Sequence, residues 1–270
     1  MVKQNIGLIG CGAMGSALAR GMIGRGGVDP NTVYLYDLNE ERKNILASEV
    51  KANTAPGLDD FIPLCKHVFI AVKPQDTEGL LYAVKPLIQP DQIYVSVAAG
   101  ITISYIESCL YPGTKVIRLM PNTPCLIGEG AIVISTGESV TDEERQVVER
   151  MLKPLGLTMR LPENLMDAAT GLSGTGPAYV YLFIETMIDA GVSVGIRRDA
   201  ASKLVIQNVI GAAKMLDSNA QHPAELRNIV TSPAGTTSSA LLTLEEEGFR
   251  SCLIKAVREA TKRSEELRLG

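Results

Sequence analysis

The sequence is poor in the residues that several common enzyme classes depend on. It has only two histidines, His67 and His222, so a hydrolase that needs a histidine base is hard to build. Its five cysteines form no CxxC spacing and no HxxxH pair occurs, which favours reduced thiols in the core over disulfides or zinc. They are Cys11, Cys65, Cys109, Cys125 and Cys252. We therefore expect no metal site.

Long apolar runs and an excess of one charge are also missing. Gly, Pro or a charged residue interrupts every apolar stretch well before the roughly 20 residues that a membrane span needs. The 26 basic and 30 acidic residues are interspersed and leave a net charge of -4, so no basic surface for nucleic acid is indicated. We expect a cytoplasmic protein without a signal peptide, and neither membrane nor nucleic acid as a partner.

Apolar residues are plentiful, at 46% of a chain of 270, which is enough for the cores of two domains. In the first half, short apolar runs alternate with segments of helical spacing. The strand-like runs are 5–10, 33–37, 67–72, 92–97 and 115–120, and helices are expected over 13–25, 39–50, 76–88 and 103–110. Continuous apolar strands separated by helices are typical of a parallel sheet covered on both faces.

Two more strands, near 131–135 and 157–161, would complete this sheet, with a helix between them. That helix opens at Thr141, and Glu144 three residues later completes a capping box. Residues 1–161 therefore predict an α/β Rossmann domain, the dinucleotide-binding fold with a doubly wound, mostly parallel sheet.

Beyond residue 161 the strand-like runs give way to long segments of helix-forming residues, and residues 162–270 predict an all-α domain. Segments rich in Ala, Leu and Ile cover 177–194, 199–216, 237–247 and 249–267. The run Tyr179–Ile184 is apolar on every face of a helix, and such a helix must be buried on all sides. A domain of this length hides several such helices poorly, so we expect an intertwined homodimer formed through the C-terminal half.

A dinucleotide fingerprint stands between the first strand and the first helix. The segment Gly10-Cys11-Gly12-Ala13-Met14-Gly15 has the GxGxxG pattern in the context that a Rossmann fold requires. The first glycine permits the sharp turn, the second lets the backbone approach a pyrophosphate, and the third allows close helix packing. The segment is therefore predicted to bind a cofactor through Gly10, Gly12, Ala13, Met14 and Gly15; a tight turn that binds nothing is the alternative.

Asp37 ends the second strand, where an acidic side chain accepts hydrogen bonds from the adenosine ribose diol and repels a 2′-phosphate. This favours NADH over NADPH. Arg42 and Lys43 lie within reach of the same loop and could compensate for a phosphate charge, so both cofactors stay open.

The ends of two further strands complete the predicted cofactor site. These ends supply Ala71, Val72, Lys73 and Pro74 from one strand, and Ala98 and Ala99 from the other. Open α/β sheets bind ligands at this edge, and small residues there leave room for a nicotinamide ring. Lys73 either lies along the cofactor or is an ordinary surface residue, and it is not expected to be catalytic.

Two glycine-rich stretches interrupt the helical second half, at 172–179 and 230–237. Both look like turns that open helices, with Pro177 near a first helical position and Gly235-Thr236-Thr237 directly before the later helix. Such turns offer backbone N–H groups and hydroxyls, which is the chemistry of an anion site.

Across essentially its whole length, the chain closely resembles the Δ1-pyrroline-5-carboxylate reductase family. The most specific segments are SGTGPAYVYLFIE from Ser173 and HPAELRNIVTSPAGTTSSALLTLEEEGFR from His222. Further similarity lies in GLIGCGAMGSALARG from Gly7, AVKPQ from Ala71, SVAAGI from Ser96 and RLMPNTP from Arg118. The resemblance implies a Rossmann domain followed by a helical dimerisation domain, and it allows rings of dimers. It also implies the last step of proline biosynthesis, in which hydride passes from NAD(P)H to the C=N bond of a cyclic imine carboxylate.

The resemblance further implies the substrate residues. The backbone amides of Gly235, Thr236 and Thr237 would hold the substrate carboxylate, and the Thr237 hydroxyl would contact the ring nitrogen. Ser232 of the same turn is counted with them, and Glu163 matches a position near the substrate in some relatives. Such a reduction needs alignment of two reactants and an activated imine, without a nucleophile or a metal.

Some alternatives stay open, and two residues depart from the family pattern. Asp37 stands where many relatives have residues suited to a 2′-phosphate, so the resemblance does not decide the cofactor. Ala234 stands where glycine is usual, which narrows the backbone geometry if the turn needs a positive φ. Thr237 could also be an ordinary helix cap. A β-hydroxyacid dehydrogenase is the second candidate, but it needs a lysine as acid–base group, and none lies between Pro177 and Lys203. A cofactor-binding sensor without turnover would not need the second anion site.

Overall fold

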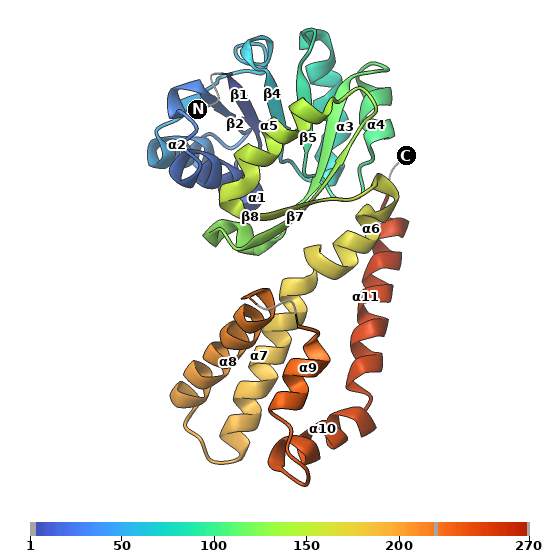
Figure 1. The fold of residues 1–270 in the computed structure, drawn as a ribbon. Helices are drawn as coiled ribbons and strands as arrows, with labels where there is room; N and C mark the ends of the chain where they lie inside the picture. Colours follow the sequence, from blue (N-terminus) through green and yellow to red (C-terminus); the bar gives the residue numbers. More distant parts are fainter. Residues whose placement is uncertain (1–3, 219–220, 269–270) are drawn as a thin grey trace. The chain divides into compact units, whose positions relative to one another are not determined.

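A computed structural model describes residues 4–218 and 221–268, and its contacts divide the chain into two compact units (Figure 1). Unit 1 comprises Met1–Thr175 and Glu259–Gly270, and unit 2 comprises Gly176–Arg258. This is a division by contacts, and the domain boundary expected at residue 161 stays a prediction.

Unit 1 is built on an eight-stranded sheet with the order β3-β2-β1-β4-β5-β6-β7-β8. The strands are β1 Ile6–Ile9, β2 Val33–Tyr36, β3 Asn53–Thr54, β4 His67–Ile70, β5 Ile93–Ser96, β6 Lys115–Met120, β7 Gly130–Thr136 and β8 Gly156–Arg160. The first six run parallel, while β7 is antiparallel to β6 and parallel to β8. The predicted Rossmann class is therefore confirmed. The strand order reverses at β1, which lies between β2 and β4.

Helices cover both faces of this sheet (Figure 1). They are α1 Ala13–Ala19, α2 Glu40–Val50, α3 Pro74–Val84, α4 Ile103–Cys109, α5 Asp142–Leu152 and α6 Met166–Ala169. On one face, Leu18 of α1, Leu46 of α2 and Val148 of α5 share an apolar core. On the other face, Leu81 of α3 and Ile106 of α4 belong to a second core. Two cores, one on each face, explain why the strands are apolar without alternation.

The local signals for helix ends are confirmed, with one difference in helix type. Asn39 caps α2 by accepting a hydrogen bond from the Arg42 N–H, and Thr141 and Glu144 form both bonds of the capping box of α5. The helix expected over 13–25 is α-helical only to Ala19 and continues as a π-helix over Arg20–Arg25. The short strand β3 was not predicted.

In its described residues, unit 2 consists of helices and the turns that join them, as expected. Its helices are α7 Gly176–Ser193, α8 Arg198–Ser218, α9 Pro223–Ile229, α10 Thr236–Glu246 and the first part of α11 Phe249–Glu266. α7 packs against α8, and the ring of Phe183 contacts that of Phe249. Sequence periodicity missed the short helix α9. The stretch 172–179 is not a simple turn, because Thr170–Gly174 forms a π-helical segment just before α7.

The helix α7 carries apolar side chains that its own chain leaves uncovered. None of its residues is buried within the single chain, and Leu182 is 64% exposed. Among residues 4–218 and 221–268, no helix combines the length and apolarity that crossing a bilayer requires. The same residues contain no group of three His, Cys, Asp or Glu side chains suited to a metal ion.

Candidate functional site

The residues predicted to bind the cofactor lie at the carboxyl ends of four neighbouring parallel strands. They are Gly10 after β1, Asp37 after β2, Ala71 after β4, and Ala98 after β5. Main-chain bonds hold these ends together, as in the 2.8 Å bond from the Gly10 N–H to the Tyr36 carbonyl. This is the edge at which the strand order reverses, where open α/β sheets place their ligands.

The three glycines of the fingerprint have three different surroundings. Gly10 has a φ of +97°, and a Cβ there would lie 2.6 Å from the Ala71 carbonyl oxygen. A Cβ on Gly15 would lie 1.8 Å from the Gly10 carbonyl oxygen, so the turn closes tightly on α1. By contrast, a Cβ on Gly12 would meet nothing within 4 Å. Open space directly before the helix that begins at Ala13 fits an approaching pyrophosphate.

Asp37 fastens the fingerprint to the end of β2. Its Oδ2 accepts a hydrogen bond from the Cys11 N–H at 2.7 Å, and its Oδ1 accepts one from the Asn39 N–H at 2.8 Å. A carboxylate has about four acceptor positions, so capacity for a ribose diol remains. Burial, with a smaller contribution from Asp37, raises the pKa of the Cys11 thiol to about 12. The thiol is therefore neutral, in line with a packing role.

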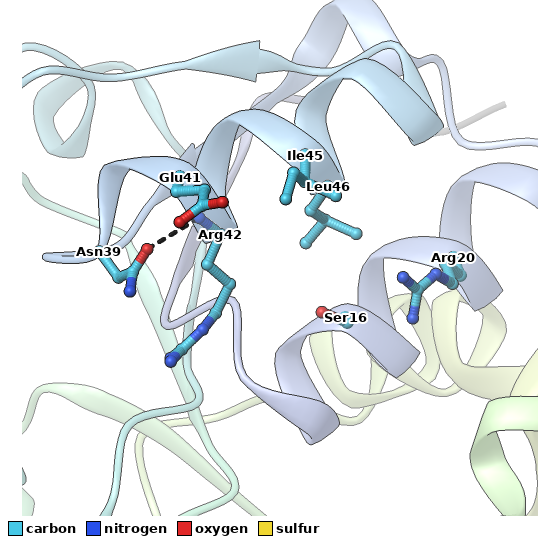
Figure 2. A pocket seen from close by; sticks show the side chains of 7 residues that line it. All are labelled: Ser16, Arg20, Asn39, Glu41, Arg42, Ile45 and Leu46. Atoms are coloured by element: carbon cyan, nitrogen blue, oxygen red, sulfur yellow. Dashed lines mark hydrogen bonds between the residues drawn. The ribbon is translucent and has the colours of Figure 1, made fainter.

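A pocket of about 290 Å³ opens between α1 and α2 (Figure 2). Its lining residues are Ser16, Arg20, Asn39, Glu41, Arg42, Ile45 and Leu46. Arg42 is half-exposed, and its Nη1 lies 3.7 Å from Asp37 Oδ2. The expectation that Lys43 could also meet a phosphate is wrong. Lys43 is 2% exposed, and its Nζ donates to Glu40 Oε1 at 2.7 Å and to the Ala55 carbonyl at 3.0 Å.

The segment after β4 reaches the same edge. Pro74 is the first residue of α3, and Lys73 is its N-cap. The Lys73 carbonyl accepts hydrogen bonds from the Asp76 N–H at 3.0 Å and from the Thr77 hydroxyl at 3.1 Å. Its side chain is exposed, so both interpretations of Lys73 stay open.

The loop after β5 turns sharply beside this edge. The Ala98 N–H donates to Ser96 Oγ at 3.2 Å, and Ala98 is buried while Ala99 is exposed. Gly100 has a φ of +73°, which a residue with a side chain rarely adopts. Thr102 then caps α4 by accepting a hydrogen bond from the Tyr105 N–H at 3.1 Å.

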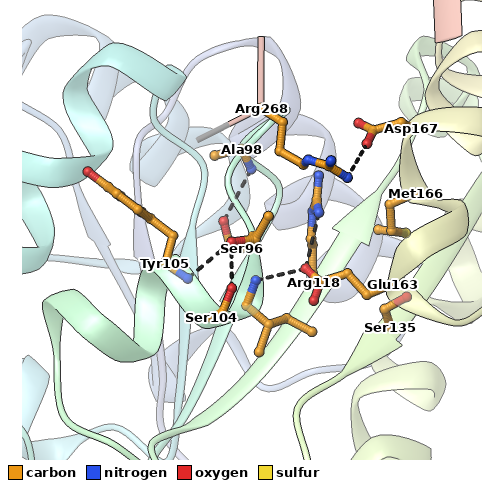
Figure 3. Close-up of polar contacts among 12 residues, drawn as sticks. Ser96, Ala98, Ser104, Tyr105, Arg118, Ser135, Glu163, Met166, Asp167 and Arg268 are labelled. Carbon is orange, nitrogen blue, oxygen red and sulfur yellow. Dashed lines mark hydrogen bonds and ion pairs between the residues drawn. The ribbon is translucent and has the colours of Figure 1, made fainter. Parts of the chain in front are cut away.

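Arg118, a residue that the sequence interpretation gave no role, lies in the middle of β6 and is 1% exposed. Figure 3 shows its ion pair with Glu163, in which Arg118 Nη1 lies 3.1 Å from Oε1. The same oxygen accepts the Ile103 N–H at 2.7 Å. Within the described residues, Arg118 Nε and Nη2 have no hydrogen-bond partner. A lone charge inside an apolar strand was the signal that could have revealed this residue.

Asp167 was also missed, because its partners lie far along the chain. Its Oδ1 accepts a hydrogen bond from the Ser264 hydroxyl at 2.7 Å. Its Oδ2 accepts one from Arg268 Nη1 at 3.1 Å, which Figure 3 shows. Asp167 and Ser264 are both buried. No local pattern links residues 97 and 101 positions apart.

In unit 2, the predicted substrate turn opens α10. Gly235 is the N-cap, so Thr237 is the second helical residue and is not a cap. Ala234 has a φ of +54°, which confirms that this turn needs a left-handed residue. A Cβ on Gly235 would lie 2.2 Å from Ser232 Oγ, so the turn is closed tightly there. The first amides of α10, at Thr236 and Thr237, have no acceptor inside the helix and suit an anion.

Comparisons with known proteins match this arrangement over the full chain. Residues 163–267 match the family described as pyrroline-5-carboxylate reductase dimerisation, and residues 5–100 match NADP oxidoreductase coenzyme F420-dependent. The pyrroline-5-carboxylate reductase of Methanosarcina acetivorans is 39% identical over 267 residues, covering 99% of each chain. The solved pyrroline-5-carboxylate reductase of Coxiella burnetii is 30% identical with a TM-score of 0.94, again covering 99% of each chain. The Plasmodium falciparum pyrroline carboxylate reductase, solved with NADP bound, is 31% identical with a TM-score of 0.89 and the same coverage.

Proposed function

The chain belongs to the pyrroline-5-carboxylate reductase family, and from this premise we propose which of its residues carry out the reaction and with which cofactor. It is an NAD(P)H-dependent oxidoreductase that reduces the C=N bond of Δ1-pyrroline-5-carboxylate to L-proline, the last step of proline biosynthesis. The β-hydroxyacid dehydrogenase alternative lacks support, since α7 contains no lysine.

The cofactor is assigned to the carboxyl edge of the sheet in unit 1. The fingerprint residues Gly10 to Gly15 would hold its pyrophosphate, and Ala71 to Pro74 with Ala98 and Ala99 would line its nicotinamide half. When bound, the cofactor supplies the hydride. The observation that carries this assignment is the open space at Gly12, between two glycines that are packed tightly against the backbone.

The substrate carboxylate is assigned to the turn before α10. Thr236 and Thr237 are the first two residues of a helix of 11 residues, whose positive end attracts a carboxylate. Gly235, predicted as a third donor, already donates its N–H to the Ser232 carbonyl at 3.1 Å, so it shapes the turn and leaves the N–H groups of Thr236 and Thr237 for the carboxylate. The residues thus fix the acid group of the substrate and leave its ring to be oriented by a second contact.

Thr237 provides that second contact in our proposal. Its hydroxyl can donate and accept, so it can hydrogen-bond the ring nitrogen in either protonation state. Catalysis then depends mainly on holding the C=N bond in one orientation, which requires no nucleophile from the protein. Glu163, the weakest of the predicted substrate contacts, is already bonded to Arg118 and to the Ile103 N–H.

We assign NADH as the preferred cofactor, with NADPH also accepted. The Asp37 carboxylate, held by the Cys11 and Asn39 amides, follows β2 at the edge where the ribose is predicted to bind. It favours a diol over a 2′-phosphate. Arg42 provides one cation that reduces this discrimination without reversing it.

The assembly is assigned as a homodimer formed through residues 162–270, with rings of dimers as the larger form. The exposed apolar side chains of α7 support a partner for this helix, and the dimerisation family matches residues 163–267. The five cysteines are all free, and four of them are buried, which suits the reducing cytoplasm. Light scattering would give the mass of the assembly, and a monomer would contradict the proposal.

A single assay tests the function directly. Purified protein is mixed with Δ1-pyrroline-5-carboxylate and either NADH or NADPH, and loss of nicotinamide absorbance is followed together with formation of L-proline. We expect turnover with both and a higher kcat/KM with NADH. No turnover with either cofactor would reject the function, and a higher kcat/KM with NADPH would reject only the preference.

A further inference from the structure

Two carboxylates of one short segment hold the loop that carries Ala98 and Ala99. We propose that Glu163 and Asp167 are positioning residues that keep the 97–102 loop in the shape that receives the nicotinamide ring. This inference rests on the proposed placement of the nicotinamide at Ala98 and Ala99. It gives Glu163 a task that needs no contact with the substrate.

Glu163 holds the end of the loop where α4 begins. Its Oε1 accepts the N–H of Ile103, the first residue of α4, at 2.7 Å. That N–H has no acceptor inside the helix, and a carboxylate at this end is favoured by the helix dipole. The loop therefore meets a fixed negative group directly after Thr102.

Arg118 in turn fixes Glu163. Its guanidinium is buried in β6 and lies 3.1 Å from the oxygen that accepts the Ile103 N–H (Figure 3). An ion pair with a buried partner is screened little by water, so the carboxylate cannot turn away without leaving the arginine uncompensated. The position of α4 is thus tied to the central sheet through one oxygen atom.

Asp167 acts on the same loop from its other side, through the end of the chain. It binds Ser264 and Arg268, and between these two residues lies Leu267. A Cβ on Gly100 would come within 2.8 Å of the Leu267 carbonyl oxygen. The C-terminal segment therefore lies directly against the turn that follows Ala99, and Asp167 holds this segment in place.

The loop is also anchored by Ala98 and Ile101, which are buried in the apolar core beside α4, while Ala99 lies between these anchors. Its internal hydrogen bonds are long, at 3.2 Å from the Ala98 N–H to Ser96 Oγ and 3.5 Å from the Ile101 N–H to the Ala98 carbonyl. Ala99 itself is exposed. Because hydride transfer depends steeply on the placement of the reacting groups, contacts that fix the chain on both sides of Ala99 add precision to that placement.

The test compares the whole cofactor with a fragment that lacks the nicotinamide. Asp167→Asn and Glu163→Gln are made in the full chain, and affinities for NADH and for ADP-ribose are measured by calorimetry. The emission of bound NADH reports the surroundings of its ring. Glu144→Gln is the matched control, because Glu144 also accepts a helix N-terminal N–H and pairs with a lysine, at the opposite edge of the sheet.

We expect both variants to bind NADH about tenfold more weakly or worse, with altered emission, lower kcat and nearly unchanged affinity for ADP-ribose. The Glu144→Gln control should change neither affinity. Glu163→Gln could fail to fold, because it leaves the charge of Arg118 uncompensated. In that case the same affinities are measured for Asp167→Asn and for Arg268→Ala, which removes a half-exposed side chain.

Equal losses of NADH and ADP-ribose affinity, or no loss of either, would overturn the proposal. Because binding needs no turnover, this result is independent of the imine assay. A wild-type protein that binds NADH but does not reduce the imine would refute the proposed function and leave the positioning role to be judged from the affinities.

Discussion

The guanidinium of Arg42 lies 3.7 Å from the carboxylate of Asp37, beside the pocket between α1 and α2. The next residue, Lys43, is buried and bonded elsewhere, so it offers no cation to this pocket, whose wall also carries Glu41. A second pocket arginine, Arg20, is engaged by both carboxylate oxygens of Glu49 at 2.7 Å. We therefore propose that the balance of Asp37 and Arg42 decides the choice between NADH and NADPH.

Arg42→Ala should strengthen the preference for NADH. A charge-assisted bond to a 2′-phosphate contributes about 1.5–3 kcal/mol, so kcat/KM with NADPH should fall by about tenfold or more. The value with NADH should stay within about twofold, because a ribose diol does not need the cation. Arg20→Ala is the control, and it should leave the ratio unchanged. Equal losses with both cofactors after Arg42→Ala would contradict this explanation.

Gly12 and Gly15 should respond in opposite ways to an added side chain. Gly12→Val places its Cβ in open space at an ordinary φ of -68°, so the protein should fold with an unchanged Tm and lose affinity for NADH. Gly15→Ala places a Cβ 1.8 Å from the Gly10 carbonyl oxygen and should destabilise the fold itself. Thermal unfolding and calorimetric titration separate the two effects. Normal NADH affinity in Gly12→Val would remove the fingerprint from the cofactor site.

Thr237→Ala should lower kcat/KM for the imine by about tenfold or more, which corresponds to a lost bond of about 1.5–3 kcal/mol. Because Thr237 is not the N-cap of α10, the substitution should leave the Tm nearly unchanged. Thr243→Ala is a suitable control on the same helix, where the hydroxyl donates to the Ser239 carbonyl. Steady-state kinetics at saturating cofactor provides the measurement, and unchanged kinetics would exclude Thr237 from the site.

Ala234→Gly should stabilise the protein. Ala234 has a φ of +54°, a conformation that is unfavourable by roughly 1–2 kcal/mol for a residue with a side chain. Part of that gain is lost because glycine makes the unfolded chain more flexible, so a net gain of about 0.5–1 kcal/mol is expected. Ala240→Gly, in the regular part of α10, should instead destabilise by about 1 kcal/mol. Urea unfolding of the two variants would show opposite shifts of midpoint.

Acid should weaken the fold through His67. This side chain is buried at the start of β4 and, within the described chain, its Nδ1 has no hydrogen-bond partner. Burial, together with the nearby Lys66 charge, lowers the pKa of His67 to about 4 from an ordinary value of 6.5. Between pH 6.5 and pH 4, His67 is therefore protonated in the unfolded chain and neutral in the folded chain. The free energy of unfolding decreases as the pH falls through this range.

The loss attributed to His67 should reach about 3 kcal/mol near pH 4, from about 1.4 kcal/mol for each unit of pKa difference. His67→Gln cannot take up this proton and should show a smaller decrease between neutral and acidic pH. Urea unfolding at several pH values gives the free energy of unfolding against pH for the wild type and for the variant. The contribution of carboxylates that also titrate is the same in both and cancels when one is subtracted from the other. If the free energy of unfolding changes with pH equally in the two proteins, His67 is not responsible for the loss of stability in acid.

The fold could be predicted to a large extent because its signals are local. Apolar runs, the capping pair Thr141 and Glu144, and the N-cap Asn39 each act within a turn or two of the chain, and the structure confirms them. The same holds for Ala234, since a turn before a helix fixes the conformation of its own residues. The π-helix at Arg20–Arg25 and the strand β3 were not predicted, because neither has a distinct pattern of side chains.

By itself, the sequence determined the Rossmann pattern, the fingerprint, the helical second half and the family, all of which depend on neighbouring residues or on whole motifs. Only the tertiary structure decided that Lys43 is buried, that Glu163 pairs with Arg118, and that Asp167 holds Ser264 and Arg268. These contacts join residues that meet only when the sheet and its helices have packed. The partner that a side chain finds then depends on which groups lie beside it in the packed structure, and the order of residues along the chain does not give that arrangement.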